Sequence, residues 1–516
     1  MINKKKNNKI FKIIFPFSLG LISSFSLPPY NFFLINFITL PLLFSLIVNN
    51  KKNFNLFFIG WLFGFGYFLF SLYWIANSLT FDENMKIFIP IGLILVPTFL
   101  AIFYGLSMLL IGFFKIKYNF SSIIIFAIIF SIVEFVRGYV LGGFPWNLIA
   151  YSWSSFTSFI QIISFIGTYS FNLLTITLFL LPTILLFKIT FKKKIVYLFS
   201  ISFLLIINVI YGSYKIKKFN ELSLKKIPTT IKVISPKIEI DRFYIENSSE
   251  EIIKNIIEIS KPINSEDTLF ILPEGILTDI YLNDLKKYKS IFQTNFSNNH
   301  KIILGINSLE DEKIYNTMVL INNNLDILQI YKKNKLVPFG EFIPFENFFA
   351  SIGFKKITEG YQSFSFDNKR EAIEFKNIKF LPLICYEIIY SGRLKKNDDE
   401  ITFILNISED GWFGNSIGIH QHFVHSKFRA LEEGSYLIRA ANNGISAYID
   451  PNGIILKNIE STSKGFIDIN SYKKTKKTLF SVHGNKLFLY FLIIYTILFF
   501  FLKKKGSSNE KKLSFY

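Results

Sequence analysis

The sequence predicts a membrane protein with two parts, a polytopic α-helical domain and an α/β domain. Of its 516 residues, 51% are hydrophobic and 62 are phenylalanine, which is too apolar for a soluble chain of this length. Eight apolar stretches each approach the roughly 20 residues that a helix needs to cross a bilayer. Before the last of them, short apolar runs alternate with polar segments, a pattern typical of strands and helices in a folded α/β domain.

The apolar stretches divide the chain into three segments. They lie at residues 10–27, 31–48, 54–81, 87–114, 120–139, 160–187, 195–211 and 487–502. We therefore expect a membrane domain of seven spans over residues 1–214, an α/β domain over 215–485, and a last span with a short tail over 486–516. The first stretch follows a basic start but precedes no small-residue cleavage site, so it is expected to stay as a membrane helix.

Lysines gather at alternate connections between these stretches. They follow the second, fourth, sixth and eighth stretches, whereas the other connections are almost free of cations. The positive-inside rule then predicts that both termini are cytoplasmic and that the α/β domain lies in the periplasm, across the inner membrane of a bacterium. The same placement accounts for the formal charge of +20 without a nucleic-acid partner, which would require a basic patch on a soluble domain.

Two charged residues stand at the end of the fifth stretch. Glu134 and Arg137 are three residues apart, which places them on one helix face, and we expect an ion pair between them. Charges at that depth are costly and are usually paired or functional. The glycine- and tryptophan-containing segment at 142–153 that follows is typical of an interfacial loop.

The polar region contains strand and helix patterns in alternation. Strands are predicted at residues 230–234, 268–272, 301–306, 318–322, 327–331, 378–384, 402–407 and 446–449. Helices are predicted at 249–259 and 421–437, and Asp-Pro-Asn-Gly at 450–453 predicts a hairpin turn. This mixture favours a layered α/β sandwich.

Three reactive side chains follow predicted strands. The only cysteine, Cys385, comes directly after the strand at 378–384, where a thiol is held rigidly and can still be reached. A lone cysteine is more often a small buried hydrophobe, and one cysteine permits no intrachain disulfide. However, Glu274 and Lys333 also follow strands. A thiolate needs a base and a nearby positive charge, which these two residues would supply.

The neighbours of these residues resemble motifs of the nitrilase/carbon–nitrogen hydrolase superfamily. Pro273-Glu274 resembles the base motif, and Cys385-Tyr386-Glu387 resembles the nucleophile motif. The segment from Tyr331 to Glu341 matches the lysine motif, whose register places the catalytic lysine at Lys333 and leaves Lys332 and Lys335 facing solvent. The chain as a whole resembles the membrane-embedded branch, the apolipoprotein N-acyltransferase family. The resemblance implies a nitrilase-like αββα sandwich.

The resemblance also implies supporting residues. They are Glu341 and Glu387, which would orient the lysine and the thiol, Tyr386 beside the nucleophile, and Trp412 with Phe413 as an aromatic wall. Salt bridges and ordinary core packing are the alternative roles for these side chains. The chain departs from the family at Ser235-Pro236-Lys237, where a Gln-x-Asn loop is usual, at Arg242-Phe243-Tyr244, and at Leu272, where a tryptophan is usual.

Two further segments stand out. His420, His422 and His425 share a predicted helix and could form a metal site or serve a Cys–His hydrolase, but no metal motif accompanies them. We therefore expect neither a metal nor a cofactor. The apolar, aromatic segment at 342–354 is expected to be a lid that touches lipid or, alternatively, ordinary core.

The resemblance implies a reaction. An acyl chain would pass from a membrane phospholipid, through a thioester on Cys385, to the N-terminal amine of a diacylglyceryl-modified apolipoprotein, and the integral membrane enzyme would act as a monomer. Two alternatives stay open: a membrane-tethered carbon–nitrogen hydrolase that gives the acyl group to water, and a transporter with an extracytoplasmic domain. Transport would need ionisable residues inside the spans, and most spans have none.

Overall fold

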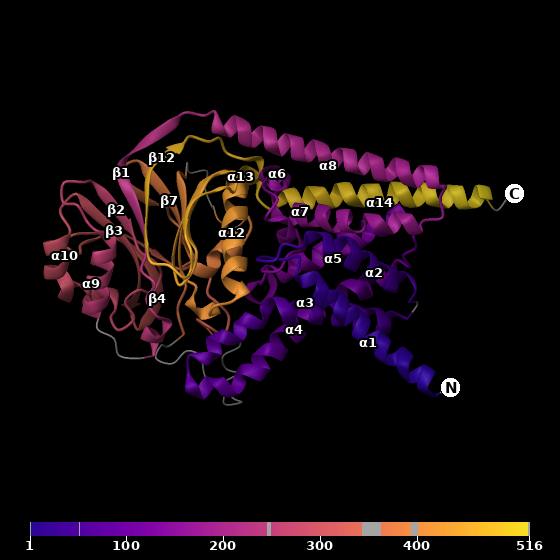
Figure 1. The fold of residues 1–516 in the computed structure, drawn as a ribbon, viewed down its shortest axis with the longest axis horizontal. Coiled ribbons are helices and arrows are strands. Elements are labelled where there is room, and N and C mark those ends of the chain that lie inside the picture. The colour runs from indigo at the N-terminus through magenta and orange to yellow at the C-terminus, as the bar shows by residue number, and fades with distance from the viewer. Residues whose placement is uncertain are drawn as a thin grey trace. The chain divides into compact units, whose positions relative to one another are not determined.

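The structure is a computed structural model that describes residues 2–50, 52–244, 249–342, 363–392, 394 and 401–513. All but the first residue of the predicted lid at 342–354 therefore lies outside the described residues. The chain forms two compact units (Figure 1). One comprises Met1–Ala76, Pro90–Lys217 and His483–Tyr516, and the other comprises Asn77–Ile89 and Lys218–Val482. The short segment Asn77–Ile89, from within the expected membrane domain, thus belongs with the α/β part.

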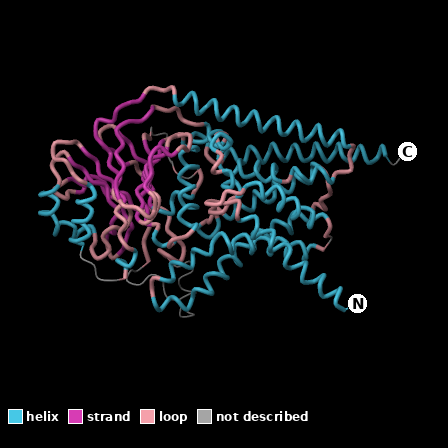
Figure 2. Tube along the Cα trace, in the orientation of Figure 1, coloured by secondary structure: helices cyan, strands magenta, loops and turns pink. Residues whose placement is uncertain are grey.

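The described residues of the first unit form helices joined by loops, with no strand among them (Figure 2). Its α-helices are α1 (Ile2–Ser24), α2 (Asn36–Val48), α3 (Asn53–Leu72), α4 (Ile89–Phe113), α5 (Phe120–Arg137), α6 (Thr157–Ile160), α7 (Ile163–Phe179), α8 (Phe191–Asn220) and α14 (Lys486–Leu513). Every predicted span overlaps one of these helices. Among the described residues, six helical segments are long and apolar enough to cross a membrane, whereas Phe11–Ser24 and Phe33–Val48 are shorter apolar helices.

The helices of this unit pack closely through small residues and turn apolar side chains outward. A Cβ atom at Gly20 of α1 would lie 1.8 Å from the carbonyl oxygen of Phe63 in α3, so only glycine allows this approach. On α8, by contrast, large side chains such as Phe199 and Leu204 are exposed. Exposed apolar surface of this kind is stable where lipid covers it, which agrees with a membrane-embedded unit.

The second unit is built on two six-stranded sheets. Their strands are β1 (Leu224–Ser235), β2 (Thr268–Ile271), β3 (His300–Glu310), β4 (Lys313–Asn322), β5 (Ile327–Lys332), β6 (Ile373–Phe375), β7 (Ile378–Ile384), β8 (Phe403–Glu409), β9 (Tyr436–Asn442), β10 (Ser446–Ile449), β11 (Ile455–Ile459) and β12 (Gly465–Lys473). The order in one sheet is β12-β1-β2-β3-β4-β5 and in the other β11-β10-β9-β8-β7-β6. The central trios β1-β2-β3 and β7-β8-β9 are parallel.

The core of this unit lies between the sheets, with helices outside. Ile271 and Met318 of the first sheet share one buried cluster with Phe380 and Leu405 of the second. The helices α9 (Ser249–Ser260) and α10 (Lys289–Asn295) cover the outer face of the first sheet. The helix α12 (Ile417–Glu433) packs against β9 of the second sheet. These four layers are the αββα sandwich that the family resemblance implies.

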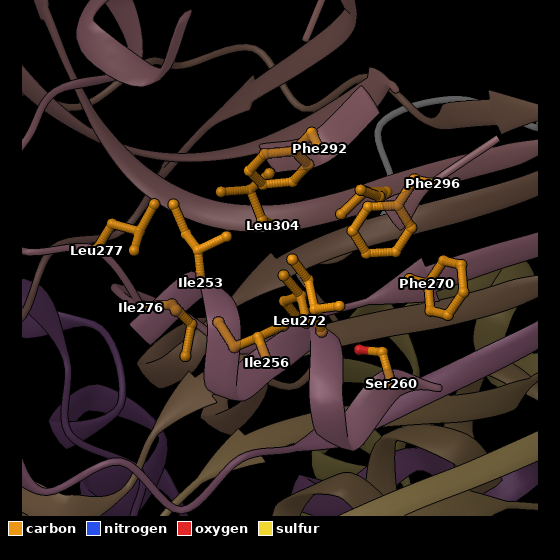
Figure 3. A pocket seen from close by; sticks show the side chains of 12 residues that line it. Ile253, Ile256, Ser260, Phe270, Leu272, Ile276, Leu277, Phe292, Phe296 and Leu304 are labelled. Atoms are coloured by element: carbon orange, nitrogen blue, oxygen red, sulfur yellow. The ribbon is translucent and has the colours of Figure 1, made fainter. Parts of the chain in front are cut away.

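An apolar cavity lies under α9 and α10 (Figure 3). Ile256, Phe270, Phe292 and Phe296 line it, with Ser260 as the polar residue. Since successive side chains of a strand point to opposite faces, Phe270 faces the helices while its neighbours face the core between the sheets. The cavity offers no acid, base or cation, so it is a packing feature rather than a reaction site.

The structure corrects one predicted helix and adds strands that the patterns missed. The helix predicted at 421–437 ends at Glu433, because Gly434 takes a left-handed conformation with φ of +61° and the chain continues as β9. The sequence patterns also missed the central strand β9 and the short or edge strands β6, β11 and β12. The hairpin at 450–453 is confirmed: β10 and β11 pair antiparallel, and the Gly453 N–H donates to the Asp450 carbonyl at 2.9 Å.

Candidate active site

Three strand ends bring the predicted reactive residues together. Glu274 lies three residues after β2, Lys333 directly after β5, and Cys385 directly after β7. The first two strands belong to one sheet and β7 to the other, so the site forms where the ends of the two sheets meet. The charges of Glu274 and Lys333 both act on the Cys385 thiol.

Lys333 links two carboxylates. Its Nζ donates to Oε1 of Glu274 at 3.2 Å and to Oε1 of Glu341 at 2.9 Å. The Asn316 side-chain amide donates to the same two oxygens, at 2.7 Å and 3.0 Å. Burial by itself lowers the pKa of Lys333, but Glu274 and Glu341 raise it more, and the net pKa lies well above the usual range. The side chain is therefore a permanent cation, which suits it to stabilise an oxyanion.

Cys385 occupies a strained backbone position. It has φ of +50°, unusual for a residue with a side chain, and it opens the short 3-10 helix Cys385–Ile389 at the end of β7. Burial raises the pKa of its thiol, Glu274 raises it further, and Lys333 lowers it in part. The thiol is therefore protonated at rest, and a base must remove its proton before the sulfur can attack.

Glu387 is anchored on every side. Its oxygens accept hydrogen bonds from Arg370 Nη2 at 2.6 Å, from the Tyr331 hydroxyl at 2.8 Å and from the Ile384 N–H at 2.8 Å. The N–H of Asn334, next to Lys333, donates to it at 3.0 Å. Glu387 therefore joins the backbone before the cysteine to the backbone after the lysine.

A second buried network lies near Cys385 and is centred on Asp410. Asp410 accepts from the Ser408 hydroxyl at 2.7 Å and from Arg439 Nη2 at 2.8 Å, and it pairs with His422 Nδ1 at 2.9 Å. Arg439 Nη1 donates to Oδ1 of Asn406, whose Nδ2 donates to the carbonyl of Cys385 at 3.5 Å. The Arg439 cation holds the pKa of Asp410 well below its usual range against the effect of burial. This network connects β8, β9 and α12 to the backbone of Cys385.

Sequence reasoning named few of these partners. Asn316, Arg370, Asp410 and Arg439 were not predicted as site residues, although Asn316 and Arg439 are polar positions within apolar strand patterns. That pattern is a usable signal, since a buried polar side chain must find a partner. The partner itself is distant in sequence and cannot be read from the pattern.

The three histidines of α12 differ in burial and in their contacts. His422 and His425 are buried and His420 is half-buried, and His422 serves the Asp410 network. Within the described ranges, no group of three or more His, Cys, Asp or Glu side chains is placed to hold a metal ion. His422 thus connects α12 to the buried Asp410 network.

The predicted aromatic wall is assembled around Trp412. Its ring lies 4.9 Å from that of Phe243 and 6.1 Å from that of Phe81, measured between centroids. Phe413 packs edge-on against His422, and its carbonyl accepts from the Asn77 side chain at 2.7 Å. Tyr386 packs edge-on against Tyr390. The segment Asn77–Ile89 therefore supplies part of this wall.

The segments that depart from the family have structural partners. The Ser235 hydroxyl donates to the carbonyl of Ala441 at 3.3 Å, and Lys237 Nζ donates to the carbonyl of Thr462 at 2.7 Å. Leu272 is buried in the cluster under α9 and α10. Arg242 is buried and forms an ion pair with Glu409, the last residue of β8.

Two family descriptions match this chain. Residues 19–181 match the "Apolipoprotein N-acyltransferase N-terminal domain", and residues 269–476 match "Carbon-nitrogen hydrolase". The second match covers β2 to β12 and includes all three reactive residues.

Several curated relatives are similar over most of their length. An apolipoprotein N-acyltransferase of Rickettsia prowazekii is 33% identical over 440 residues, 83% of this chain and 85% of the relative. Those of Rhizobium rhizogenes and Agrobacterium fabrum are 29% and 28% identical, over 87% and 94% of this chain and 88% and 94% of the relatives. Among solved structures, a CN-hydrolase superfamily protein of Xanthomonas campestris is 13% identical, with a TM-score of 0.34 over 47% of this chain and 90% of that chain.

Proposed function

Because this chain belongs to the apolipoprotein N-acyltransferase family, we propose that it transfers an acyl chain from a membrane phospholipid to the N-terminal amine of diacylglyceryl-modified apolipoproteins. It is a multi-pass membrane enzyme that joins a helical unit to a carbon–nitrogen hydrolase domain. The observation that carries the catalytic assignment is one lysine ammonium shared by two carboxylates, one of which acts on the buried Cys385 thiol.

The first half of the reaction acylates the enzyme. Glu274 takes the proton from Cys385 Sγ, and the thiolate attacks the carbonyl carbon of a phospholipid ester. Negative charge develops on the carbonyl oxygen, and the Lys333 ammonium stabilises it. The ester C–O bond then breaks, the leaving alkoxide takes the proton from Glu274, and a lysophospholipid departs. The acyl chain remains on Cys385 as a thioester.

The second half transfers the acyl chain to the amine. The free α-amine of the apolipoprotein attacks the thioester carbonyl, Glu274 accepts the excess proton, and the C–S bond breaks to give an amide. Glu274 returns the proton to the sulfur, which restores the thiol. A thioester reacts with amines more readily than an oxygen ester does, so dividing the reaction lowers each barrier.

A two-stage labelling experiment tests this mechanism. Purified enzyme is given a phospholipid with a radiolabelled acyl chain, and a diacylglyceryl lipopeptide is added afterwards. We expect label on Cys385 first and on the peptide amine second. Label that appears only as free fatty acid would instead identify a membrane-tethered hydrolase, and absence of label from Cys385 would contradict the thioester.

We propose that both termini are cytoplasmic and that the catalytic domain, taken as residues 215–485, faces the periplasm. The support is the lysine asymmetry between alternate connections. Single cysteines introduced as Asn84→Cys and Thr190→Cys, in a Cys385→Ala background, provide the test. An impermeant thiol reagent should label the first in intact cells and the second only after permeabilisation, and the reverse pattern would overturn this orientation.

We further propose that the enzyme acts as a monomer. The support is that one chain supplies the base, the lysine and the nucleophile. Molar mass measured by light scattering in detergent, with activity assayed on the same fractions, decides between a monomer and an active oligomer.

A further inference from the structure

The general base Glu274 has two carboxylate oxygens in different situations. Oε1 accepts from Asn316 and from Lys333, which occupies both of its lone pairs. Oε2 accepts from the backbone N–H of Glu409 at 3.0 Å, which leaves a lone pair for a proton. Oε2 is therefore the oxygen of Glu274 that has a lone pair for a proton, and its position depends on the backbone of Glu409.

The side chain of Glu409 fixes that backbone. Its carboxylate is 1% exposed, and Oε1 accepts from the Gly411 N–H at 2.8 Å. Oε2 accepts from Asn442 Nδ2 at 2.7 Å and from Arg242 Nη2. Burial raises the pKa of Glu409, and the Arg242 cation opposes that rise. A buried carboxylate held by this many donors has little freedom to move, and neither has its own N–H group.

The Arg242 side chain, also 1% exposed, holds the other side of the base. Its Nη2 donates to the carbonyl of Gly275 at 3.0 Å, and Gly275 directly follows Glu274. Its Nη1 donates to the carbonyl of Glu239 at 2.8 Å. One guanidinium thus connects the backbone after the base to the residue whose N–H holds Oε2 of the base.

We propose that the buried Arg242–Glu409 ion pair is a positioning pair for the general base. It fixes the Glu409 N–H and the Gly275 turn so that Oε2 of Glu274 is held ready to take the thiol proton. Neither residue touches the reacting atoms, so both act through Glu274. This inference rests on the proposed function, because it assigns the pair to the acylation of Cys385.

The test compares a neutral double variant with wild-type enzyme. Removing one partner alone would leave an uncompensated buried charge and could prevent folding, whereas Arg242→Gln with Glu409→Gln removes both charges together. The control is Lys254→Gln with Glu250→Gln, which neutralises an exposed pair on α9. Acylation is followed as the burst of p-nitrophenolate from a p-nitrophenyl acyl ester, and thermal unfolding is measured on every variant.

We expect the double variant to acylate on the order of tenfold more slowly per folded molecule, with the ester concentration at half-maximal rate changed less than twofold. Arg242→Lys, which keeps the charge but not the two-pronged contact, should recover part of the rate. The control variant should match wild type. A wild-type acylation rate constant in the double variant or in Arg242→Lys would overturn the inference. An unchanged rate constant together with a higher ester concentration at half-maximal rate would also overturn it.

Failure of the proposed function would look different. The burst reports acylation of Cys385 whatever the natural donor is, so the ratio of variant to wild type tests the positioning pair alone. A wild-type burst without any transfer from phospholipid to lipopeptide would reject the proposed acyl transfer and leave the positioning pair supported.

Discussion

Each unit of the molecule contains a cluster of buried charges, and the two clusters are built differently. In the helical unit, Glu134 pairs with Arg137 at 3.1 Å and also accepts from the Tyr104 hydroxyl at 2.9 Å and from Asn172 at 3.2 Å. Arg137 in turn donates to the carbonyl of Phe144. One cation meets one anion, and both carboxylate oxygens have donors.

In the catalytic unit, one cation serves two anions beside a thiol. Lys333 contacts Glu274 and Glu341, so two carboxylates share one ammonium and the cluster carries an excess negative charge. The Glu134–Arg137 pair has equal positive and negative charge, so it has no excess charge to neutralise. A cluster with one more anion than cations can take up a proton and so lose its excess charge. We propose that this charge imbalance distinguishes the catalytic cluster from the structural one.

The largest effect is expected from removal of Lys333, the cation that the two carboxylates share, or of Cys385. Lys333→Ala and Cys385→Ala should each lower acyl transfer on the order of 10³-fold or more, measured as labelled lipopeptide formed per minute. Lys332→Ala is the matched control, because the neighbouring lysine is partly exposed and pairs with Glu310 at the surface. Equal losses at Lys332 and Lys333 would show that basic charge in general, rather than one ammonium, is required.

The variant Glu274→Gln should change the rate of acyl transfer and the rate of Cys385 alkylation in opposite directions. Glu274→Gln should lower acyl transfer by about 100-fold or more, since the proton acceptor is lost. The same change removes a charge that raises the pKa of Cys385, so more thiolate exists at pH 8. Alkylation by iodoacetamide should therefore be about three- to tenfold faster than in wild type. In Lys333→Ala it should be slower, and slower alkylation in both variants would contradict this electrostatic assignment.

A smaller effect is expected at the anchor of Glu387. Tyr331→Phe removes the hydroxyl that donates to this carboxylate but keeps the ring in the core. The loss of one hydrogen bond to a charged group should slow acyl transfer by about five- to tenfold. The initial rate at saturating lipopeptide measures it. An unchanged rate would mean that Arg370 and the backbone donors alone hold Glu387.

The balanced pair should give the smallest effect on turnover. Glu134→Gln leaves Arg137 without its counter-charge and should lower the free energy of unfolding by about 3–5 kcal/mol. Turnover per folded molecule should stay within about twofold of wild type. Thermal unfolding in detergent and transfer assays on the folded fraction measure the two quantities separately. If Glu134→Gln lowered turnover as much as Glu274→Gln does, the proposed difference between the structural and the catalytic cluster would be wrong.

The sequence patterns predicted the ends of the strands before Glu274, Lys333 and Cys385 to within one residue, because local periodicity determines them. The predicted strand at 378–384 matches β7 residue for residue, and with it the place of Cys385. The helix predicted to reach residue 437 shows the limit. Apolar residues continue past Gly434, and only the left-handed backbone there separates α12 from β9.

The contacts that connect distant segments could not be predicted. Arg242 and Glu409 are 167 positions apart, and Asn77 reaches Phe413 across 336. Without their partners these residues read as surface charges or as loop residues. Glu274, Lys333 and Cys385 could be named because their neighbours resemble family motifs. The residues that hold them in place can be identified only from the three-dimensional structure.

The first sheet has a consequence for how the molecule is made. β1, where the catalytic unit begins, pairs antiparallel with β12, where it ends, so that Leu224 lies opposite Lys473. During synthesis, β1 emerges almost 250 residues before its partner. Until then the nascent sheet exposes an unpaired edge, which is a template for wrong pairing. The first sheet of the catalytic unit can therefore be completed only after β12 has emerged, and α13 (Leu479–His483) and α14 follow it along the chain.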